Sequence, residues 1–381
     1  MVTITASKTD KINKKIRQHN GSFSERARSS VFIVLYFAVV VVLAVFADPR
    51  SHVIPSFQNN PLIPFGFFIL VFALTIWANY FIAKEINNCF IKYHKIHNDV
   101  ILFLMLSFCQ IASIWVVPLS ETTYNILHWN WSAFTTQIVF ISCLVSSLLA
   151  LLLFSTIYFK LNHIRTTKNI WLGVLAIIIV SLLFVSVYYL VASKCWFVFL
   201  MLIIIPILND SFAYLGGMAF GKHKMAPLLS PKKTWEGLVI GLIISIVLCV
   251  AIIIFLFLNN DDTMHNYELL GSFIGWQWLT TDTREQFIII INEWWWFVLS
   301  IGSLIILLII STFGDLLFSY FKRVNQIKDY SNLIPGHGGI LDRVDSFALV
   351  ITVYFLISLI VCLSTNNLHD NSFLLTPFNI Y

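Results

Sequence analysis

Residues 196–220 read WFVFLMLIIIPILNDSFAYLGGMAF, and residues 238–258 read LVIGLIISIVLCVAIIIFLFL. Each is an apolar run of about 20 residues, the length at which an α-helix crosses a hydrocarbon core roughly 30 Å thick. A short polar segment with several lysines separates the two runs. This pattern predicts two transmembrane helices joined by a polar loop.

Similar apolar runs recur along nearly the whole chain. Of its 381 residues, 58% are hydrophobic and 11% are charged, and the mean hydropathy is +0.83. This composition excludes a water-soluble globular protein. We therefore predict an all-α, polytopic membrane protein with about nine transmembrane helices. The apolar runs are 31–47, 62–83, 101–120, 137–159, 169–192, 196–220, 238–258, 294–320 and 344–363.

The distribution of positive charge predicts the orientation of the chain. Residues 1–30 form a basic arm, and no convincing cleavage site follows the first apolar run, so we interpret that run as a membrane anchor. With the amino terminus in the cytoplasm, only Arg50, Lys194 and Arg284 of the 24 lysines and arginines lie on the opposite side. This positive-inside bias predicts a carboxyl terminus outside. The net charge of +5 is thus a topology signal and not evidence for nucleic-acid binding.

Ionisable residues divide the membrane region into two unequal parts. Residues 31–195 contain about five predicted helices whose apolar runs carry almost no ionisable residue. Residues 196–363 contain about four, with several ionisable residues at their cytoplasmic ends, so we expect the chemistry there. Residues 259–293 form a predicted outside loop, and residues 364–381 a carboxyl-terminal tail. The six cysteines are dispersed and are predicted to be packing residues.

Two features of the segment from Asp210 to Gly237 point to chemistry. Asp210 interrupts an apolar run, and a carboxylate in a membrane costs a few kcal/mol unless it is paired, hydrated or metal-bound. The alternative is a carboxylate that only caps a broken helix. Ser230-Pro231-Lys232-Lys233-Thr234-Trp235-Glu236-Gly237 then places two lysines and two hydroxyls at a predicted helix start, where an anion such as a polyphosphate is favoured. Ordinary positive-inside lysines are the alternative here.

Acidic and basic residues also gather around the last two predicted helices. Asp315, Ser319 and Lys322 are spaced by four and three residues, so a helix places them on one face. Asp342 and Asp345 share a face where the last helix begins; helix capping is the simpler explanation for either one alone. Carboxylates are the usual ligands of magnesium, and lysine and arginine bind phosphoryl oxygens. The combination favours phosphoryl or nucleotidyl transfer at the cytoplasmic interface.

A longer motif narrows this reading to a family. The segment Ser319-x-Phe321-Lys322-Arg323-x4-Lys328-Asp329-x-Ser331-x2-Ile334-Pro335-x-His337-Gly338-Gly339-Ile340-x-Asp342-Arg343-Val344-Asp345 resembles the signature of the CDP-diacylglycerol synthases, also called phosphatidate cytidylyltransferases. The Asn209-Asp210, Ser230 to Gly237 and Gly314-Asp315 segments are similar to the family's upstream elements. The resemblance is specific over residues 196–363 and only architectural before them.

The resemblance implies transfer of a cytidylyl group from CTP to phosphatidic acid, with CDP-diacylglycerol and pyrophosphate as products. It implies magnesium at a two-metal site, with manganese as an alternative ion and a monovalent co-ion left open. Asp315 and Asp342 would hold the metal pair, with Asp210 and Asp345 as nearby ligands. The implied catalytic residues are Asp315, Asp342, Asp345, Lys322 and Arg343. The implied substrate-binding residues are Ser230, Lys232, Lys233, Thr234, Glu236, Ser319, Arg323, Lys328, His337, Gly338 and Gly339.

The expected partners are CTP, phosphatidic acid and membrane lipids, without nucleic acid, and a homodimer is left open. A bacterial-type cell membrane is favoured over endoplasmic reticulum, with the active site on the cytoplasmic side. Two alternatives stay open from the residues themselves: a CTP-dependent kinase of a lipid alcohol, and an ion or proton transporter that uses the intramembrane carboxylates.

Overall fold

The structure is a computed structural model that describes residues 35–36, 38–40, 42–43, 62–91, 96–114, 133–162, 167–192, 196–259, 294–333 and 338–364. The predicted basic arm (1–30), most of the outside loop (259–293) and nearly all of the tail (364–381) lie outside these residues, as does His337. The run 31–47 is described only in part, as helix.

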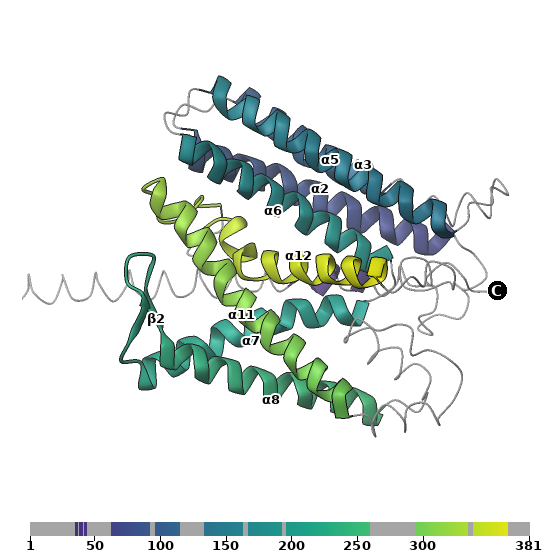
Figure 1. Cartoon of the computed structure of the whole chain (residues 1–381). Helices are drawn as coiled ribbons and strands as arrows, with labels where there is room; N and C mark the ends of the chain where they lie inside the picture. The colour runs from purple at the N-terminus through teal and green to yellow at the C-terminus, as the bar shows by residue number, and fades with distance from the viewer. Residues whose placement is uncertain are drawn as a thin grey trace, which may run out of the picture.

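Helices build almost all of the described chain (Figure 1). The first group comprises α2 (Leu62–Phe90), α3 (Ile96–Ile114), α5 (Ala133–Leu161) and α6 (Thr167–Ala192). The second comprises α7 (Trp196–Phe220), α8 (Trp235–Asn259), α11 (Trp294–Val324) and α12 (Leu341–Ser364). Between α7 and α8 lie two short strands, β1 (Lys224–Ala226) and β2 (Ser230–Thr234).

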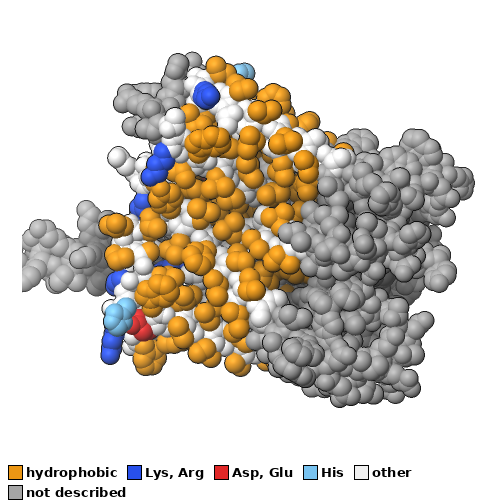
Figure 2. Space-filling view, in the orientation of Figure 1, with side chains coloured by type: hydrophobic (Ala, Val, Ile, Leu, Met, Phe, Trp, Pro, Cys, Tyr) orange, Lys and Arg blue, Asp and Glu red, His pale blue; other side chains and the backbone are white. Residues whose placement is uncertain are grey.

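Six helices within the described residues are long and apolar enough to cross a membrane. Every predicted apolar run from 62–83 onward overlaps a helix, and the run 196–220 coincides with α7. The prediction of an all-α, polytopic membrane protein is therefore confirmed, whereas nine spans and the orientation of the termini stay predictions. Figure 2 shows the broad apolar face of these helices, with lysine and arginine side chains gathered at the edge where the hairpin lies.

The sequence did not predict the antiparallel hairpin of β1 and β2. Pro227 occupies the second position of its turn, which the hydrogen bond from the Leu229 N–H to the Ala226 carbonyl closes at 3.1 Å. The chain then enters α8, as the predicted helix start requires. The Thr234 hydroxyl accepts the N–H of Gly237 at 3.2 Å and so caps the helix, an interaction typically worth about 1 kcal/mol.

Small residues let α7 and α8 pack closely side by side. A Cβ added at Gly237 would lie 2.5 Å from the carbonyl oxygen of Ala213, and one added at Gly241 would lie 2.8 Å from the Cβ of Ala213. Such spacing of small residues is a common means of helix association in membranes. This close packing fixes the position of the hairpin, which joins the end of α7 to the start of α8.

Helix α12 contacts helices of both groups, α6 from the first and α7 and α11 from the second (Figure 1). Its buried apolar residues include Phe347, Ala348, Ile351 and Phe355. Because Asp342 and Asp345 lie in the first two turns of α12, its packing places these acids between the two helix groups.

Candidate active site

A cavity of about 370 Å³ lies where α7, α8, α11 and α12 meet the hairpin. It is lined by residues from all three segments that the sequence singled out. The predicted site residues in its wall are Asp210, Ser230, Lys232, Lys233, Thr234, Asp315, Lys322, Asp342, Arg343 and Asp345. Segments more than 100 residues apart in the sequence thus converge on one cavity, as expected if their ends share one side of the membrane.

Lys233 connects two of the aspartates at the mouth of this cavity. The hairpin strand β2 carries its ammonium group to 2.6 Å from Oδ2 of Asp315 and 3.9 Å from Oδ1 of Asp210. The side chains of Asp210 and Asp315 are 35% and 25% exposed, so both carboxylates are open to the cavity. A positive charge therefore already lies between two acids on different helices.

Lys322 connects the other two aspartates more deeply in the protein. Its Nζ lies 2.8 Å from Oδ1 of Asp342 and 3.8 Å from Oδ2 of Asp345. The same ammonium lies 5.3 Å from the ring centre of Tyr330, within the range of a cation–π contact. Burial raises the pKa of Tyr330 well above its ordinary value, so the hydroxyl stays neutral and donates to the Phe318 carbonyl at 3.1 Å.

Asp342 also organises the loop that precedes α12. Its Oδ2 accepts the N–H groups of Tyr330 and Gly339, each at 2.9 Å. Gly338 has a φ of +87°, a conformation that side-chain-bearing residues rarely adopt, and an added Cβ there would lie 2.8 Å from Oδ2 of Asp342. The N–H groups that Asp342 accepts lie before α12, so these contacts organise the loop and do not cap the helix. Its Oδ1 faces Lys322 in the charged cavity.

Ser346 is a cavity residue that the predicted site did not include. Its hydroxyl lies 2.6 Å from Oδ2 of Asp210 and 3.4 Å from Oδ1 of Asp345, and so joins α12 to α7. The available signal was its spacing, because Ser346 follows Asp342 by four residues and shares its helix face. Asp329, Tyr214 and Thr312 also line the cavity and were likewise not predicted as site residues.

Two predicted substrate-binding residues hold the hairpin instead of lining the cavity. The carboxylate of Glu236 accepts the N–H groups of Lys222 and His223 at 3.1 Å and lies 2.5 Å from Nδ1 of His223. The guanidinium of Arg323 donates to the carbonyls of Leu229, at 3.4 Å, and Ile327, at 3.1 Å. Both residues therefore fix the position of β2 and its lysines.

The remaining predicted residues have different positions. The Ser319 hydroxyl donates to Oδ1 of Asp315 at 3.3 Å, in agreement with the helix face expected from their spacing. Lys328 is exposed, and it is not among the described residues that line the charged cavity. Gly338 and Gly339 belong to the loop that Asp342 organises, and His337 lies outside the described residues.

The donor chemistry of the cavity suits magnesium, because its acids supply hard oxygen ligands. In the described part of the chain, however, no three His, Cys, Asp or Glu side chains form a group that could hold a metal ion. Instead, the ammonium groups of Lys233 and Lys322 lie between the paired acids. The acids therefore have the ligand type that magnesium prefers, but their arrangement in the structure is one of ion pairs with lysine, and the magnesium site stays a prediction.

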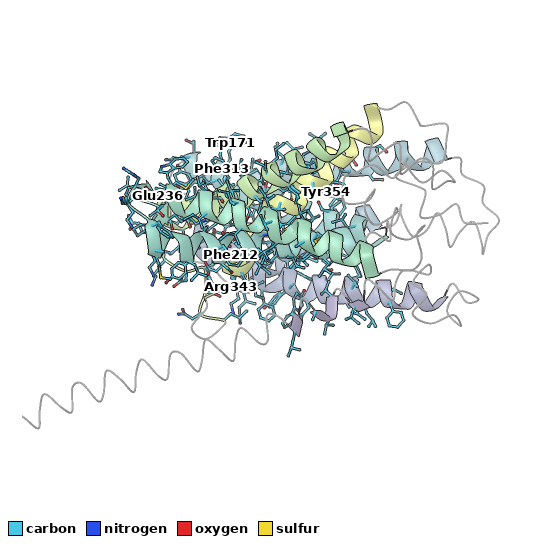
Figure 3. All side chains as sticks on the ribbon, turned by 90° about the horizontal axis from the view of Figure 1, so that it is seen from below. Trp171, Phe212, Glu236, Phe313, Arg343 and Tyr354 are labelled. Atoms are coloured by element: carbon cyan, nitrogen blue, oxygen red, sulfur yellow. The ribbon has the colours of Figure 1, made fainter. Side chains whose placement is uncertain are left out.

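A second cavity, of about 630 Å³, adjoins the first and has an almost entirely apolar wall. Helices α2, α6, α7 and α12 contribute residues such as Ala78, Phe184 and Ile203, and residues 35, 36, 39 and 40 close one side. Arg343 lines both cavities (labelled in Figure 3). A guanidinium group thus marks the boundary between a charged space and an apolar one.

The sequence was also compared with known protein families and individual proteins. The sequence profile of the cytidylyltransferase family matches residues 61–361. The chain is 28% identical over 399 residues to a Mycoplasma pneumoniae protein whose name provisionally ascribes to it phosphatidate cytidylyltransferase activity; the match covers 91% of this chain and 95% of that one.

Two shorter matches are to bacterial phosphatidate cytidylyltransferases. A phosphatidate cytidylyltransferase of Haemophilus influenzae is 39% identical over 145 residues, 38% of this chain and 40% of that enzyme. One from Staphylococcus aureus is 36% identical over 147 residues, 38% and 42% of the two chains. These matches span less than half of either relative. Together with the profile match, they confirm the resemblance drawn from the signature motif: the chain belongs to the cytidylyltransferase family, among the CDP-diacylglycerol synthases.

Proposed function

We propose that this protein is a phosphatidate cytidylyltransferase, which transfers the cytidylyl group of CTP to phosphatidic acid and releases pyrophosphate. The observation that carries the proposal is the pair of cavities that meet at Arg343. The charged cavity offers lysines and hydroxyls to a nucleoside triphosphate, and the apolar one offers a surface for lipid chains. The names of the relatives support the same pair of substrates.

The two substrates divide between the cavities. The phosphates of CTP lie in the charged cavity, within reach of Lys232 and Lys233 on the hairpin. The phosphate of the lipid lies beside Arg343, and its acyl chains extend into the apolar cavity. This placement brings the lipid phosphate next to the nucleotide without removing the chains from an apolar environment.

In the reaction, an oxygen of the lipid phosphate attacks the α-phosphorus of CTP. A bond forms between these two atoms, the bond from the α-phosphorus to the bridging oxygen breaks, and pyrophosphate leaves with that electron pair. A phosphate monoester has a second pKa near 6 and is already largely dianionic at neutral pH, about pH 7. No side chain must therefore act as a strong base, and His337 is assigned a phosphate or loop contact.

The cationic side chains stabilise the charge that develops during the transfer. Lys233, Lys322 and Arg343 reach the cavity from β2, α11 and α12. Cations held in fixed positions in a water-poor cavity stabilise phosphoryl oxygens more strongly than solvent does. Their attachment to three separate elements lets them surround a transferring group.

Magnesium is the proposed cofactor, with Asp210, Asp315, Asp342 and Asp345 as the residues that would hold it. A bound magnesium ion would supply positive charge that neutralises the phosphates. Asp210 and Asp315 are the more accessible acids of the set. If these two carboxylates held the ion, the ammonium of Lys233 would be free to bind a substrate phosphate.

The active site is assigned to the cytoplasmic side of a bacterial cell membrane, with the amino terminus on the same side and the carboxyl terminus outside. The basic residues of the hairpin and of the end of α11 support this orientation under the positive-inside rule (Figure 2). The bacterial origin of the named relatives supports the type of membrane.

Product analysis tests the proposed function. Purified protein in mixed micelles is supplied with magnesium and CTP, with and without phosphatidic acid, and pyrophosphate and CDP are both measured. Cytidylyl transfer predicts pyrophosphate release that requires phosphatidic acid, without CDP. Release of CDP in the presence of a lipid alcohol would favour the kinase, and ion flux into liposomes without nucleotide would favour a transporter.

A further inference from the structure

A buried carboxylate from the first helix group reaches the start of α12. Glu85, near the end of α2, is only 2% exposed. Its Oε1 accepts the N–H of Ile340 at 2.9 Å, and its Oε2 accepts the N–H of Leu341 at 2.7 Å. The hydroxyl of Ser331 donates to Oε1 at 2.7 Å. One side chain thus binds the first residue of α12, Leu341, and two residues of the loop before it.

From these contacts we infer that Glu85 is a positioning residue for cytidylyl transfer. It acts in place of a local cap, because a carboxylate that accepts backbone N–H groups at a helix start satisfies otherwise unpaired donors and favours the positive end of the helix dipole. The helix it holds begins at Leu341 and carries Asp342, Arg343 and Asp345 in its first two turns. The inference rests on the proposed function, since it assigns Glu85 a part in that reaction.

The local sequence explains why the cap comes from another helix. Asp342, the acid at the start of α12, already accepts the N–H groups of Tyr330 and Gly339 with Oδ2 and pairs with Lys322 through Oδ1. Within the described residues, the N–H groups of Ile340 and Leu341 donate to Glu85 and not to Asp342. The two carboxylates therefore divide the donors of one loop between them.

The glycine at position 339 makes this approach feasible. A Cβ added there would lie 2.5 Å from Oε1 of Glu85 and 2.6 Å from its carboxyl carbon, far inside normal contact distance. Gly339, predicted above as a substrate contact, therefore has a physical role in admitting the Glu85 carboxylate. Through Glu85, the first helix group also contacts the loop before α12 directly.

Kinetic analysis of Glu85→Gln in the full-length protein tests the inference, because glutamine keeps the size but loses the charge and one acceptor. We expect kcat to fall about tenfold while the KM for CTP changes less than about twofold, since the hairpin lysines stay in place. Glu85→Asp, whose carboxylate is shorter but charged, should lose less. Amide hydrogen exchange should accelerate in residues 338–346.

Asn87→Leu serves as the matched control. Asn87 is fully buried on the same helix, and its side chain contacts Asp99 at 3.0 Å and Tyr158 at 2.8 Å, away from α12. It should lower thermal stability without lowering kcat per folded molecule. If kcat of Glu85→Gln matches the wild type, or falls only in proportion to lost folded protein, the inference is wrong. An inactive wild type would instead refute the proposed function.

Discussion

Replacing Lys322 by methionine removes the cation between two buried aspartates while a side chain of similar length remains. The Nζ of Lys322 lies 2.8 Å from Asp342 and 3.8 Å from Asp345, and the three side chains are 10%, 4% and 10% exposed. Removal of one partner from a buried ion pair typically costs about 3–5 kcal/mol, because the remaining charge is left uncompensated. Loss of the contact with the Tyr330 ring adds about 1 kcal/mol.

This cost translates into a measurable loss of thermal stability. At roughly 2 °C per kcal/mol for a large domain, the unfolding midpoint of Lys322→Met in detergent should fall by roughly 8–12 °C. Lys322→Arg, which keeps the charge, should lose less. The double variant Lys322→Met with Asp342→Asn should be more stable than the sum of the single losses predicts, because fewer uncompensated charges stay buried. A midpoint for Lys322→Met within about 2 °C of the wild type would refute the reasoning.

Three further predictions concern the substrates and the hairpin. Arg343→Gln should raise the KM for phosphatidic acid about tenfold or more and that for CTP less, and equal increases would contradict the assignment of Arg343 to the lipid phosphate. Ala78→Phe, which narrows the apolar cavity, should lower kcat/KM for long-chain phosphatidic acid but not for a six-carbon-chain analogue; equal losses for both lipids would argue against acyl chains in that cavity. Glu236→Gln should weaken CTP binding through movement of the hairpin, with a smaller effect on the KM for lipid, because its carboxylate holds His223 and not a substrate; unchanged CTP binding would exclude that indirect role.

The helices and the gathering of the charged motifs could be predicted from the sequence. Apolar runs such as 196–220 are long enough to define a helix without tertiary information, and α7 has the same bounds. Asp210, Lys233, Asp315 and Asp342 were expected at one side of the membrane, and all four line one cavity. Charge distribution and hydropathy were sufficient for this level of description.

The contacts of individual side chains could not be predicted in the same way. The hairpin strands are too short to show an alternating pattern, so the sequence did not predict the turn that brings Glu236, at the start of α8, to His223, just before β1. Glu85 is a single acid beside an apolar run, and its partners Ile340 and Leu341 lie more than 250 residues away. Whether Lys233 pairs with Asp315 or with a substrate phosphate depends on distances that only the folded chain defines.

The most direct test follows the fate of the α-phosphorus of CTP. Purified protein is given magnesium, phosphatidic acid and CTP labelled at the α-phosphorus, and label in the lipid is compared with pyrophosphate released, for the wild type and for Asp315→Asn. The account predicts label in the lipid in equal amount to pyrophosphate, lost in the variant. A folded wild-type protein that binds CTP but transfers no label to phosphatidic acid would contradict it.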